Sequence, residues 1–553
     1  MLLKRGALIR RSRPGWVALV FAAAVLAVIP VVAVAAGGIT PTPAVWAQLW
    51  STVLPGMLAS TLVLLLAVAA GTLLLGAGLA WLVTAHRFPG STVFGWLLVL
   101  PLAMPAYVLG FVFLALLDFP GPVQTGLRAV FGPDAWFPEV RSIPGAAVVL
   151  SLTLYPYVYL LARTALLEQA PVTFDAARTL GAGRGRAAWR VVLPLARPSL
   201  AAGLALVMME TLTDFATVQY FNVQTVSVGV YQVWKGQFDR AAATELAGLV
   251  LVFALLVIAA ERALRGRARY HQRGGAGRGL PAEQLSGARA AAATATCVGV
   301  LAAAFVIPVG QLLWWSGAGT LRGAAGLLDP RYGSYLLNSL MVGAVAAVCC
   351  VALALIVTHG SRMTGNRLTG AAAQLTTVGY AVPGVVVAIG VLIAFAELDD
   401  GLEALGVPGG TGLVVTGSVA GIVYAYIVRF LALSYQSVDA SFTKVSPAMT
   451  ASALSLGASP VRVLARVHLP LVRTGVGAAL VLVLIDALKE LPIVLLLRPF
   501  GFTTVSVWVY ELASENFWEQ AALPALLIVA VATVPVFFLF RQVRLVDAHR
   551  KVG

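Results

Sequence analysis

The chain has 553 residues, of which 60% are hydrophobic and only 11% are charged. This composition excludes an ordinary soluble domain, in which about 25% of residues are charged. Apolar runs of about 18 residues or more recur along the whole chain, and each is long enough to cross a bilayer as a helix. The runs are continuous rather than alternating, so the sequence predicts an all-α polytopic membrane protein and not a β-barrel.

The apolar runs predict twelve membrane spans. The first, 16–36, follows a basic N-terminus, and it exceeds the roughly 7–15 apolar residues of a signal peptide, so we interpret it as an uncleaved membrane helix. The other spans are 58–85, 92–117, 144–167, 199–222, 241–260, 289–315, 336–358, 371–396, 411–436, 473–497 and 521–540. The three cysteines, Cys297, Cys349 and Cys350, lie in these runs, which favours packing over a disulfide or metal framework.

The basic residues indicate how the chain is oriented. If the N-terminus lies in the cytoplasm and the spans alternate, 30 of the 38 Lys and Arg residues fall in cytoplasmic segments. This distribution satisfies the positive-inside rule. We therefore predict a multi-pass protein of the bacterial cytoplasmic membrane, embedded in lipid, with both termini in the cytoplasm.

The sequence contains an internal duplication. Gly181 and Pro194 have counterparts later in the chain, Gly457 and Pro470, and both pairs are separated by the same offset. The other repeated segments are TVSVGVY at 225–231 and TVSVWVY at 504–510, YPYVYLLA at 155–162 and YAYIVRFL at 424–431, VTAH at 83–86 and VTH at 357–359, and Pro105 and Pro383. Because their order is kept, we predict a first repeat over 1–270, a linker over 271–288 and a second repeat over 289–553.

Each repeat holds six predicted spans. An even number makes both repeats enter and leave on the same side, as parallel repeats about an axis along the membrane normal. This architecture is typical of transporters, whose pathway runs between the two halves. A duplicated membrane scaffold without transport is the alternative.

A basic segment occupies the same place in both repeats, between the fourth and fifth spans. The first segment, 168–198, contains FDAARTLGAGRGRAAWRVVLPL, and the second, 439–473, contains MTASALSLGASPVRVLARVHLPL. In each, a glycine interrupts a helix-forming stretch and a proline marks the return into the membrane. The pattern predicts a short helix on the cytoplasmic face that docks in a groove of another protein. An ordinary basic loop held at lipid headgroups is the alternative.

These segments resemble the EAA loop of the membrane subunits of binding-protein-dependent ABC importers. The resemblance is carried in the first repeat by Asp175, Ala176, Ala177, Gly181 and Pro194, and in the second by Ala451, Ser452, Ala453, Gly457 and Pro470. It implies that these residues couple the chain to ATP-binding subunits. The second repeat lacks the acidic residue, so we expect the two contacts to be unequal.

The resemblance also implies the fold of a type I ABC importer permease and a set of partners. Two ATPase subunits would dock on the cytoplasmic face, and an extracytoplasmic binding protein would deliver the substrate. None of the five lysines lies in a G-x-x-x-x-G-K-[ST] loop, so ATP and Mg²⁺ are expected on the partner ATPase. We expect this chain itself to bind no cofactor and no nucleic acid.

Carboxylates stand inside the fifth span of each repeat. They are Glu210 and Asp214 in the first repeat and Asp486 and Glu490 in the second, each pair with the i,i+4 spacing of one helix face. Carboxylates inside a membrane usually face a cavity or a partner, so we predict that they line the substrate pathway and suit a hard cation such as Fe³⁺. No metal ligand is assigned. The alternative is structural, with Lys489 pairing to a neighbouring carboxylate and locking the helices.

Four tyrosines are predicted to line the same cavity, although tyrosines in membrane helices more often pack or lie at the interface. They are Tyr155, Tyr157, Tyr424 and Tyr426. The two-repeat layout resembles the permeases of ferric-iron importers, as do E-x-x-x-D-F-x-T-V-x-Y-F at 210–221 and K-E-L-P-x-x-L-L-L-R-P-F-G-F at 489–502. The resemblance implies import of iron(III) by alternating access.

Other functions stay open from the sequence. Related fused permeases serve thiamine and other small solutes, among them polyamines, phosphonates or sulfate. A secondary transporter driven by an ion gradient would need no docking segments. A membrane enzyme is not expected, because the five histidines form no H-x-x-x-H pair and no G-x-S-x-G occurs.

Overall fold

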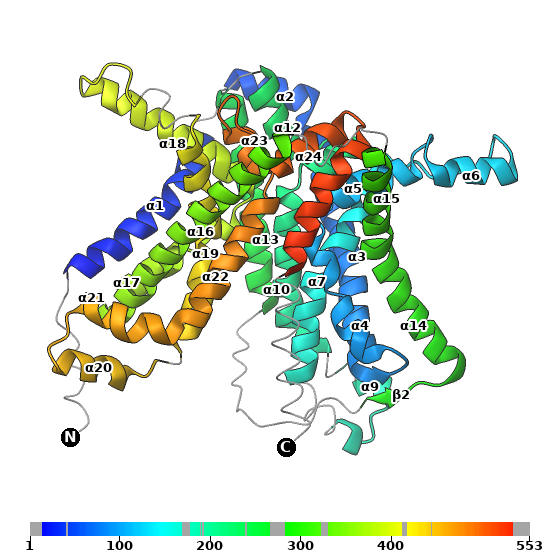
Figure 1. The fold of residues 1–553 in the computed structure, drawn as a ribbon, viewed down its shortest axis with the longest axis horizontal. Coiled ribbons are helices and arrows are strands. Elements are labelled where there is room, and N and C mark those ends of the chain that lie inside the picture. Colours follow the sequence, from blue (N-terminus) through cyan, green and yellow to red (C-terminus); the bar gives the residue numbers. More distant parts are fainter. Residues whose placement is uncertain are drawn as a thin grey trace. The chain divides into compact units, whose positions relative to one another are not determined.

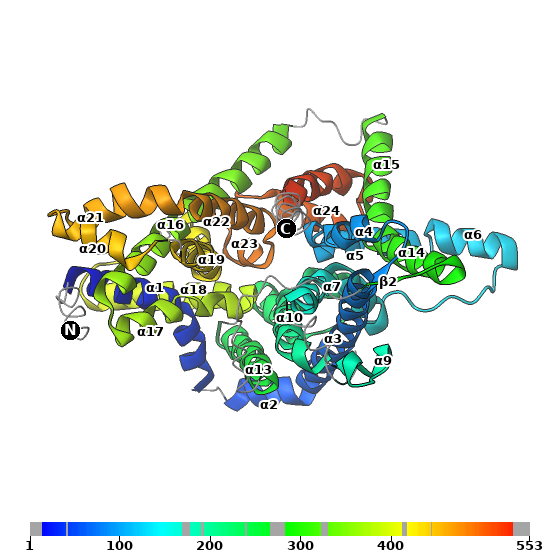
Figure 2. The ribbon, with the colours of Figure 1, turned by 90° about the horizontal axis from the view of Figure 1, so that it is seen from below.

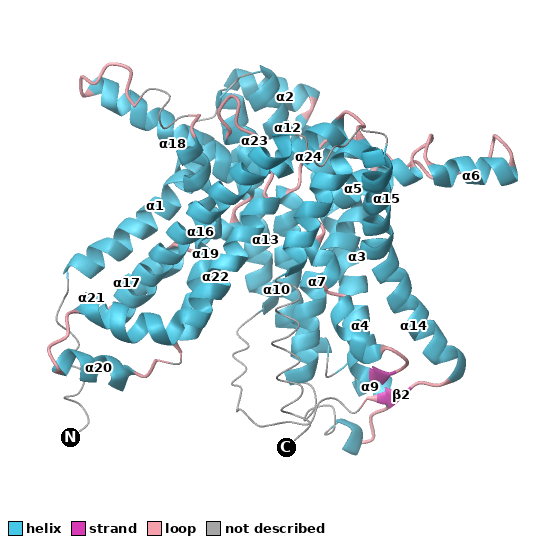
Figure 3. Ribbon diagram, viewed as in Figure 1, coloured by secondary structure: helices cyan, strands magenta, loops and turns pink. Residues whose placement is uncertain are grey.

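The chain is almost entirely helical in the computed structural model, which describes residues 14–39, 43–168, 177–187, 190, 193–237, 240–265, 282–321, 330–411, 417–443 and 445–534 (Figures 1 and 3). Two short strands in this part, β1 (His86–Arg87) and β2 (Glu283–Gln284), pair in parallel. Ten of the described helices are long and apolar enough to cross a membrane, or eleven spans if one bent pair is counted. The predicted all-α membrane protein is confirmed.

The chain divides into two compact units. Unit 1 comprises Met1–Trp46, Val230–Leu251 and Leu328–Trp508, and unit 2 comprises Ala47–Gly229, Val252–Leu327 and Val509–Gly553. These units do not coincide with the predicted repeats. The first helix of the first repeat belongs to unit 1, which consists mostly of residues from the second repeat. The first helix of the second repeat belongs to unit 2, which consists mostly of residues from the first repeat. The boundaries of the repeats themselves stay a prediction from the sequence.

Unit 1 is built around three long helices. Its elements are α1 (Pro14–Ile39), α16 (Pro330–Thr364), α17 (Arg367–Leu375), η5 (Val378–Ala381), α18 (Gly384–Ala404), α19 (Val419–Phe442), α20 (Pro447–Ser455), α21 (Pro460–Val463), η7 (Leu464–His468), α22 (Leu469–Lys489) and α23 (Pro492–Leu497). Helices α16, α19 and α22 pack against one another, and α1 lies along α16 and α18 (Figure 2). A Cβ on Gly390 of α18 would collide with the Pro30 carbonyl of α1, so glycine permits the close helix packing common in membranes.

Unit 2 has a similar core of three helices, α3, α7 and α10, which pack together. Its elements are α3 (Leu54–Ala85), β1, α4 (Ser91–Leu97), η1 (Leu100–Ala103), α5 (Ala106–Leu117), α6 (Pro122–Phe131), α7 (Ile143–Glu168), α9 (Arg184–Ala187), α10 (Leu193–Thr213), α11 (Ala216–Tyr220), β2, α14 (Gly287–Leu301), η4 (Ala302–Val306), α15 (Ile307–Leu321) and a helix over Trp518–Val534. A Cβ on Gly76 of α3 would lie 2.7 Å from the Val158 Cβ of α7. Close packing through glycine therefore occurs in both units.

Several elements follow the chain from one unit into the other. They are α2 (Pro43–Thr52), α12 (Val226–Gln232), α13 (Arg240–Arg265) and α24 (Val505–Ser514), whereas η3 (Val233–Gln237) lies within unit 1. Helix α13 is among the helices long enough to cross a membrane. The boundaries between the two units therefore fall inside helices and not only in loops.

The third predicted span of each repeat is broken at an equivalent proline. In one, η1 precedes Pro105, the N-cap of α5, and in the other, η5 precedes Pro383, the N-cap of α18. The residues before these prolines are extended, with ψ of 114° and 131°, because proline disfavours the helical conformation in the residue before it. The predicted continuous spans 92–117 and 371–396 are therefore wrong at this point. The twelfth span, 521–540, is described only as far as residue 534.

Candidate functional site

The second basic segment folds as two short capped helices. Ser446 Oγ accepts a hydrogen bond from Met449 N–H and starts α20, and Ser459 Oγ accepts one from Arg462 N–H and starts α21. Between them Gly457 has a φ of +81°, and Ala458 N–H donates to Ala453 C=O over 3.1 Å. This reversal is a Schellman motif, which ends a helix on a left-handed residue and favours glycine there. The physical reason for the glycine is therefore the turn between the helices.

The first basic segment closes the same turn. Gly181 has a φ of +84°, and Ala182 N–H donates to Ala177 C=O over 3.0 Å. Helices α9 and α10 begin at the positions equivalent to the starts of α21 and α22 in the other repeat. Pro194 and Pro470 are therefore each the second residue of the membrane helix that follows. Asp175 and Ala176 lie outside the described residues, and the coupling role of both segments stays a prediction.

Two leucines that the sequence reasoning missed are strongly exposed at these turns. Leu180 and Leu456, which occupy equivalent positions in the two repeats, are each 88% exposed. Met449 and Val461, on either side of Leu456 in the chain, are exposed as well, and no residue of α20 is fully buried. Exposed apolar groups in a cluster mark interaction surfaces. The signal available in the sequence was a leucine before the glycine in both copies.

The fifth predicted span of each repeat is broken beside its second carboxylate. Helix α10 ends at Thr213 and α11 begins at Ala216, whereas α22 ends at Lys489 and α23 begins at Pro492. Both breaks therefore fall at equivalent positions of the duplication, and the predicted continuous spans 199–222 and 473–497 are wrong here. Glu490 has an extended backbone, with φ −68° and ψ 125°. The single helix face expected for each carboxylate pair therefore does not reach Glu490.

In the first repeat the break is organised by Asp214. Its Oδ1 accepts a hydrogen bond from Thr217 N–H over 2.8 Å, and its Oδ2 accepts one from Thr217 Oγ1 over 2.7 Å. Asp214 N–H donates to Glu210 C=O over 2.9 Å, so the two carboxylates lie one helical turn apart. Both bonds reach the first turn of α11, so the carboxylate accepts from an N–H group that has no acceptor within that short helix.

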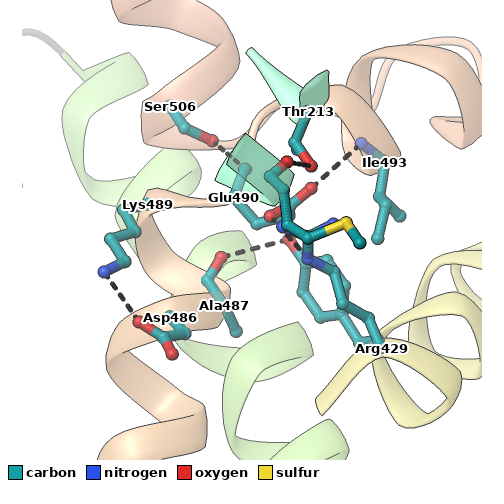
Figure 4. Close-up of polar contacts among 10 residues, drawn as sticks. Thr213, Arg429, Asp486, Ala487, Lys489, Glu490, Ile493 and Ser506 are labelled. Atoms are coloured by element: carbon teal, nitrogen blue, oxygen red, sulfur yellow. Dashed lines mark hydrogen bonds and ion pairs between the residues drawn. The ribbon is translucent and has the colours of Figure 1, made fainter. Parts of the chain in front are cut away.

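In the second repeat both carboxylates pair with basic side chains. Lys489 Nζ lies 2.7 Å from Asp486 Oδ1. Arg429 Nε of α19 lies 3.5 Å from Glu490 Oε2, with the two side chains only 6% and 7% exposed. Figure 4 shows Asp486 beside Lys489, and Glu490 beside Arg429 and Ile493. Lys489 thus pairs with a neighbouring carboxylate, as in the structural alternative, but both residues lie on α22, so this pair does not join two helices. The two ion pairs neutralise the formal charge of the carboxylates.

The first repeat has no basic residue at the matching positions. Thr213 aligns with Lys489 at the offset of the duplication, and Leu160 aligns with Arg429 when YPYVYLLA is set against YAYIVRFL. The duplication therefore carries two carboxylates with two cations in one copy, and two carboxylates without these cations in the other. Whether any of the four lines a pathway stays a prediction.

Three of the four predicted pathway tyrosines donate hydrogen bonds to backbone carbonyls inside their own units. Tyr155 donates to Leu98 C=O over 2.8 Å, Tyr424 to Leu26 C=O over 2.7 Å, and Tyr426 to Ala487 C=O over 3.1 Å. Tyr426 therefore lies beside the break that follows α22, whereas Tyr157 is a half-buried residue of α7. Their role in a pathway also stays a prediction. Within the described residues, no group of three or more His, Cys, Asp or Glu is arranged to hold a metal ion.

Comparison with known proteins adds independent information about this arrangement. Residues 72–270, which include the first basic segment and the first carboxylate pair, match the family described as binding-protein-dependent transport system inner membrane component. The sulfate transport system permease protein CysT of Escherichia coli is 31% identical over 232 residues, which cover 40% of this chain and 82% of that protein. The chain belongs to this family.

Two other transport permeases are similar to this chain, one over most of its length and one over about a third of it. The Fe(3+)-transport system permease protein FbpB 2 of Haemophilus influenzae is 25% identical over 484 residues, 87% of this chain and 89% of that protein. The molybdenum transport system permease protein ModB of Escherichia coli is 28% identical over 214 residues, only 37% of this chain. These relatives are permease subunits of transporters and not enzymes, which agrees with the prediction made for this chain. Membership in the family implies that the chain works in the inner membrane with an ATPase and a substrate-binding protein.

Proposed function

We propose that this chain is the membrane permease of an ATP-driven importer for iron(III). The observation that carries this proposal is the length of the match to the Fe(3+)-transport permease, 87% of this chain and 89% of that protein. The sulfate and molybdenum permeases match 40% or less of the chain, about the length of one repeat. A two-repeat permease in a single chain is therefore the arrangement that this relative shares.

In the proposed complex, the two glycine turns face the cytoplasm. Each docks on one of two ATPase subunits, and the substrate-binding protein docks on the opposite face of the membrane. The exposed leucines at both turns, Leu180 and Leu456, support docking because a groove on a partner would cover them. The excess of Lys and Arg on the same side supports the orientation, with both chain termini in the cytoplasm.

The proposed mechanism is alternating access. ATP binding draws the ATPase subunits together and moves the two docked turns. Each turn leads directly into a membrane helix, α10 at Leu193 and α22 at Leu469, so displacement of the turn moves the start of that helix. The pathway then opens toward the binding protein, and ATP hydrolysis returns it to the cytoplasm-facing state.

We further propose that the carboxylates of the first repeat carry most of the interaction with the cation. Asp486 and Glu490 already have basic partners, which compete with a passing cation. Glu210 and Asp214 lie one turn apart at a helix break, where oxygen ligands suit a hard ion such as Fe³⁺. In this proposal the iron ion is cargo that passes through the chain, and not a metal that the chain retains.

Uptake in whole cells tests the proposal. Cells that lack the gene, and the same cells with the gene restored, are given radioactive ferric iron, sulfate, molybdate or thiamine in separate assays. Restoration of iron uptake alone is the expected result. Restoration of sulfate, molybdate or thiamine uptake without iron would contradict the assignment of substrate while leaving the permease assignment in place.

A further inference from the structure

Two buried histidines meet in unit 1, beside the second basic segment. His359, near the end of α16, is fully buried, and His468, the last residue of η7, is 2% exposed. Their Nδ1 atoms lie 2.9 Å apart, a hydrogen-bond distance. The Trp16 ring of α1 lies against His359, and the Phe442 ring of α19 lies against His468. The pair is therefore enclosed by aromatic groups from two further helices.

The pair is connected to α20 by one more hydrogen bond. His468 Nε2 lies 3.0 Å from Thr450 Oγ1, in the first half of α20. A chain of hydrogen bonds thus runs from Thr450 through His468 to His359, and joins the helix proposed to dock on an ATPase to a long membrane helix. A cavity of about 200 Å³ lies beside this chain, lined by Thr450, Leu454 and His468 among others. Helix α20 therefore has room to shift against the bundle.

The chemistry of imidazole makes this connection sensitive to protons. A neutral histidine donates from one ring nitrogen and accepts at the other. If the Nδ1 of His468 accepts from His359, its Nε2–H donates to Thr450, and the reverse tautomer reverses both bonds. The neutral pair already has one proton between the two Nδ1 atoms, and a single added proton binds the ring nitrogen that is still deprotonated, so the bond between the rings persists. A second added proton leaves two donors facing each other with two positive charges, so the bond between the rings is lost.

The charged groups on the elements around the pair are mostly basic. Arg362 lies on α16, one turn after His359, and its Nη2 lies 2.9 Å from Asp439 Oδ1 of α19. Helix α20 and the described part of α1 contain no charged residue. Arg462 on α21, Arg466 on η7, Arg367 on α17 and Arg473 on α22 are exposed. Positive charge on these elements opposes a second positive charge on the pair, because like charges disfavour one another's ionisation.

The sequence restricts this device to the second repeat. His86 aligns with His359 in the repeated VTAH and VTH segments. At the offset of the duplication, Val192 stands in the place of His468 and Phe174 in the place of Thr450. The first repeat therefore has the first histidine but lacks counterparts of His468 and Thr450, so it cannot form the same chain of hydrogen bonds. His86 is therefore a matched control for His359.

We propose that His359 and His468 are positioning residues that transmit the movement of α20 to α16 as long as the pair holds at most one added proton. Double protonation uncouples the two helices. The π-helical turn of η7, which ends at His468, favours this role because such turns occur as local irregularities at functional sites. The inference rests on the docking role proposed for α20, and it adds proton control to it.

Hydrogen exchange tests the connection without any transport assay. The full chain in lipid nanodiscs is compared at pH 7.5 and at pH 4.5, well below the usual histidine pKa of about 6.5, because the surrounding positive charge opposes the second protonation. Protection factors for residues 447–455, corrected for the intrinsic effect of pH, should fall by about fivefold or more at pH 4.5, the loss of one typical hydrogen bond. His359→Asn keeps a polar partner near the Nδ1 position and cannot be protonated, so it should abolish the pH response. His86→Gln should leave it unchanged.

A second experiment separates coupling from docking. Thr450→Val removes the hydroxyl with little change in volume, so the ATPase should still co-purify with the chain. Uptake by the complete transporter should nevertheless fall by about fivefold, again the effect of one hydrogen bond. Unchanged uptake in Thr450→Val, or a pH response of α20 that survives in His359→Asn, would overturn the inference. Absence of iron uptake in the parent protein would instead contradict the proposed substrate, and the hydrogen-exchange result would stand independently.

Discussion

Arg429 and Glu490 form an ion pair that is more than nine-tenths buried in unit 1, with 3.5 Å between Arg429 Nε and Glu490 Oε2. A Cβ on Gly384, the first residue of α18, would lie 2.9 Å from both Arg429 Nη1 and Glu490 Oε1. The pair therefore fits only because α18 begins with glycine. It joins the end of α22 to the middle of α19, with the start of α18 close beside it.

Replacing one member of this pair should destabilise the protein more than replacing both. Arg429→Leu leaves a buried carboxylate without its partner, and we expect a loss of about 3–5 kcal/mol. The double variant Arg429→Leu/Glu490→Leu removes both charges and should recover most of that loss. Thermal unfolding of the full chain in detergent measures both variants. Equal losses in the single and double variants would show that the ion pair does not stabilise this site.

The two carboxylate pairs should differ in their importance for uptake. Glu210→Gln removes a carboxylate from the first repeat, and we expect iron uptake to fall by about tenfold or more, because contacts to charged groups are worth about 1.5–3 kcal/mol. The matched control is Asp486→Asn/Lys489→Gln, which removes an existing ion pair from the second repeat without changing the net charge. It should change uptake by less than about twofold. A larger effect in the control than in Glu210→Gln would assign the cation pathway to the second repeat.

The exposed leucines should matter for the partner and not for the fold. Leu456→Asp places a charge on a side chain that is 88% exposed, so the unfolding temperature should stay unchanged. The amount of ATPase that co-purifies should fall about tenfold or more, as expected when an apolar anchor of an interface is replaced. Leu405→Asp, at an 82% exposed leucine that follows α18, is the control. ATPase binding that persists in Leu456→Asp/Leu180→Asp would refute docking through these turns.

The contact between α1 and α18 should be sensitive to one methyl group. In Gly390→Ala the new Cβ overlaps the Pro30 carbonyl, and such overpacking costs about 1–3 kcal/mol. Gly401→Ala lies on the same helix and has nothing within 4 Å of its Cβ, so it should be neutral or slightly stabilising. Unfolding temperatures of the two variants provide the measurement. Equal stability of both would show that α1 can move away from α18 at little cost.

Much of the architecture could be predicted from the sequence. Hydropathy identified the long helices, because a membrane span must be apolar over its whole length. The spacing from Gly181 to Pro194, repeated from Gly457 to Pro470, predicted equivalent turns because few residues other than glycine adopt a positive φ there. Hydropathy carries no information about which helices are neighbours, so the place of α1 in unit 1 was not predictable in this way.

The breaks in the fifth spans were missed although the chain contains local signals for them. One signal is Pro492, the first residue of α23, because proline is favoured in the first turn of a helix and has no N–H with which to continue the preceding helix. Asp214 is another signal, because an aspartate often accepts hydrogen bonds at the start of a helix. Its carboxylate accepts hydrogen bonds from the N–H and the hydroxyl of Thr217, three residues later. The partner of Glu490 could not be predicted, because Arg429 lies on a different helix much earlier in the chain and only the packing of α19 on α22 brings the two together.

The close contact of Pro30 with Gly390 has a consequence for how the protein is made. Most of the chain separates these two residues, and α1 packs on α16 and α18, which are translated long after it. At a synthesis rate of about 5–20 residues per second, roughly 20–70 s separate the ribosome's passage over these two positions. During that interval the face of α1 that later packs on α16 and α18 is not yet covered by these helices. Assembly of unit 1 is therefore post-insertional, and a membrane chaperone or the insertion machinery has a defined window in which to hold the first helix.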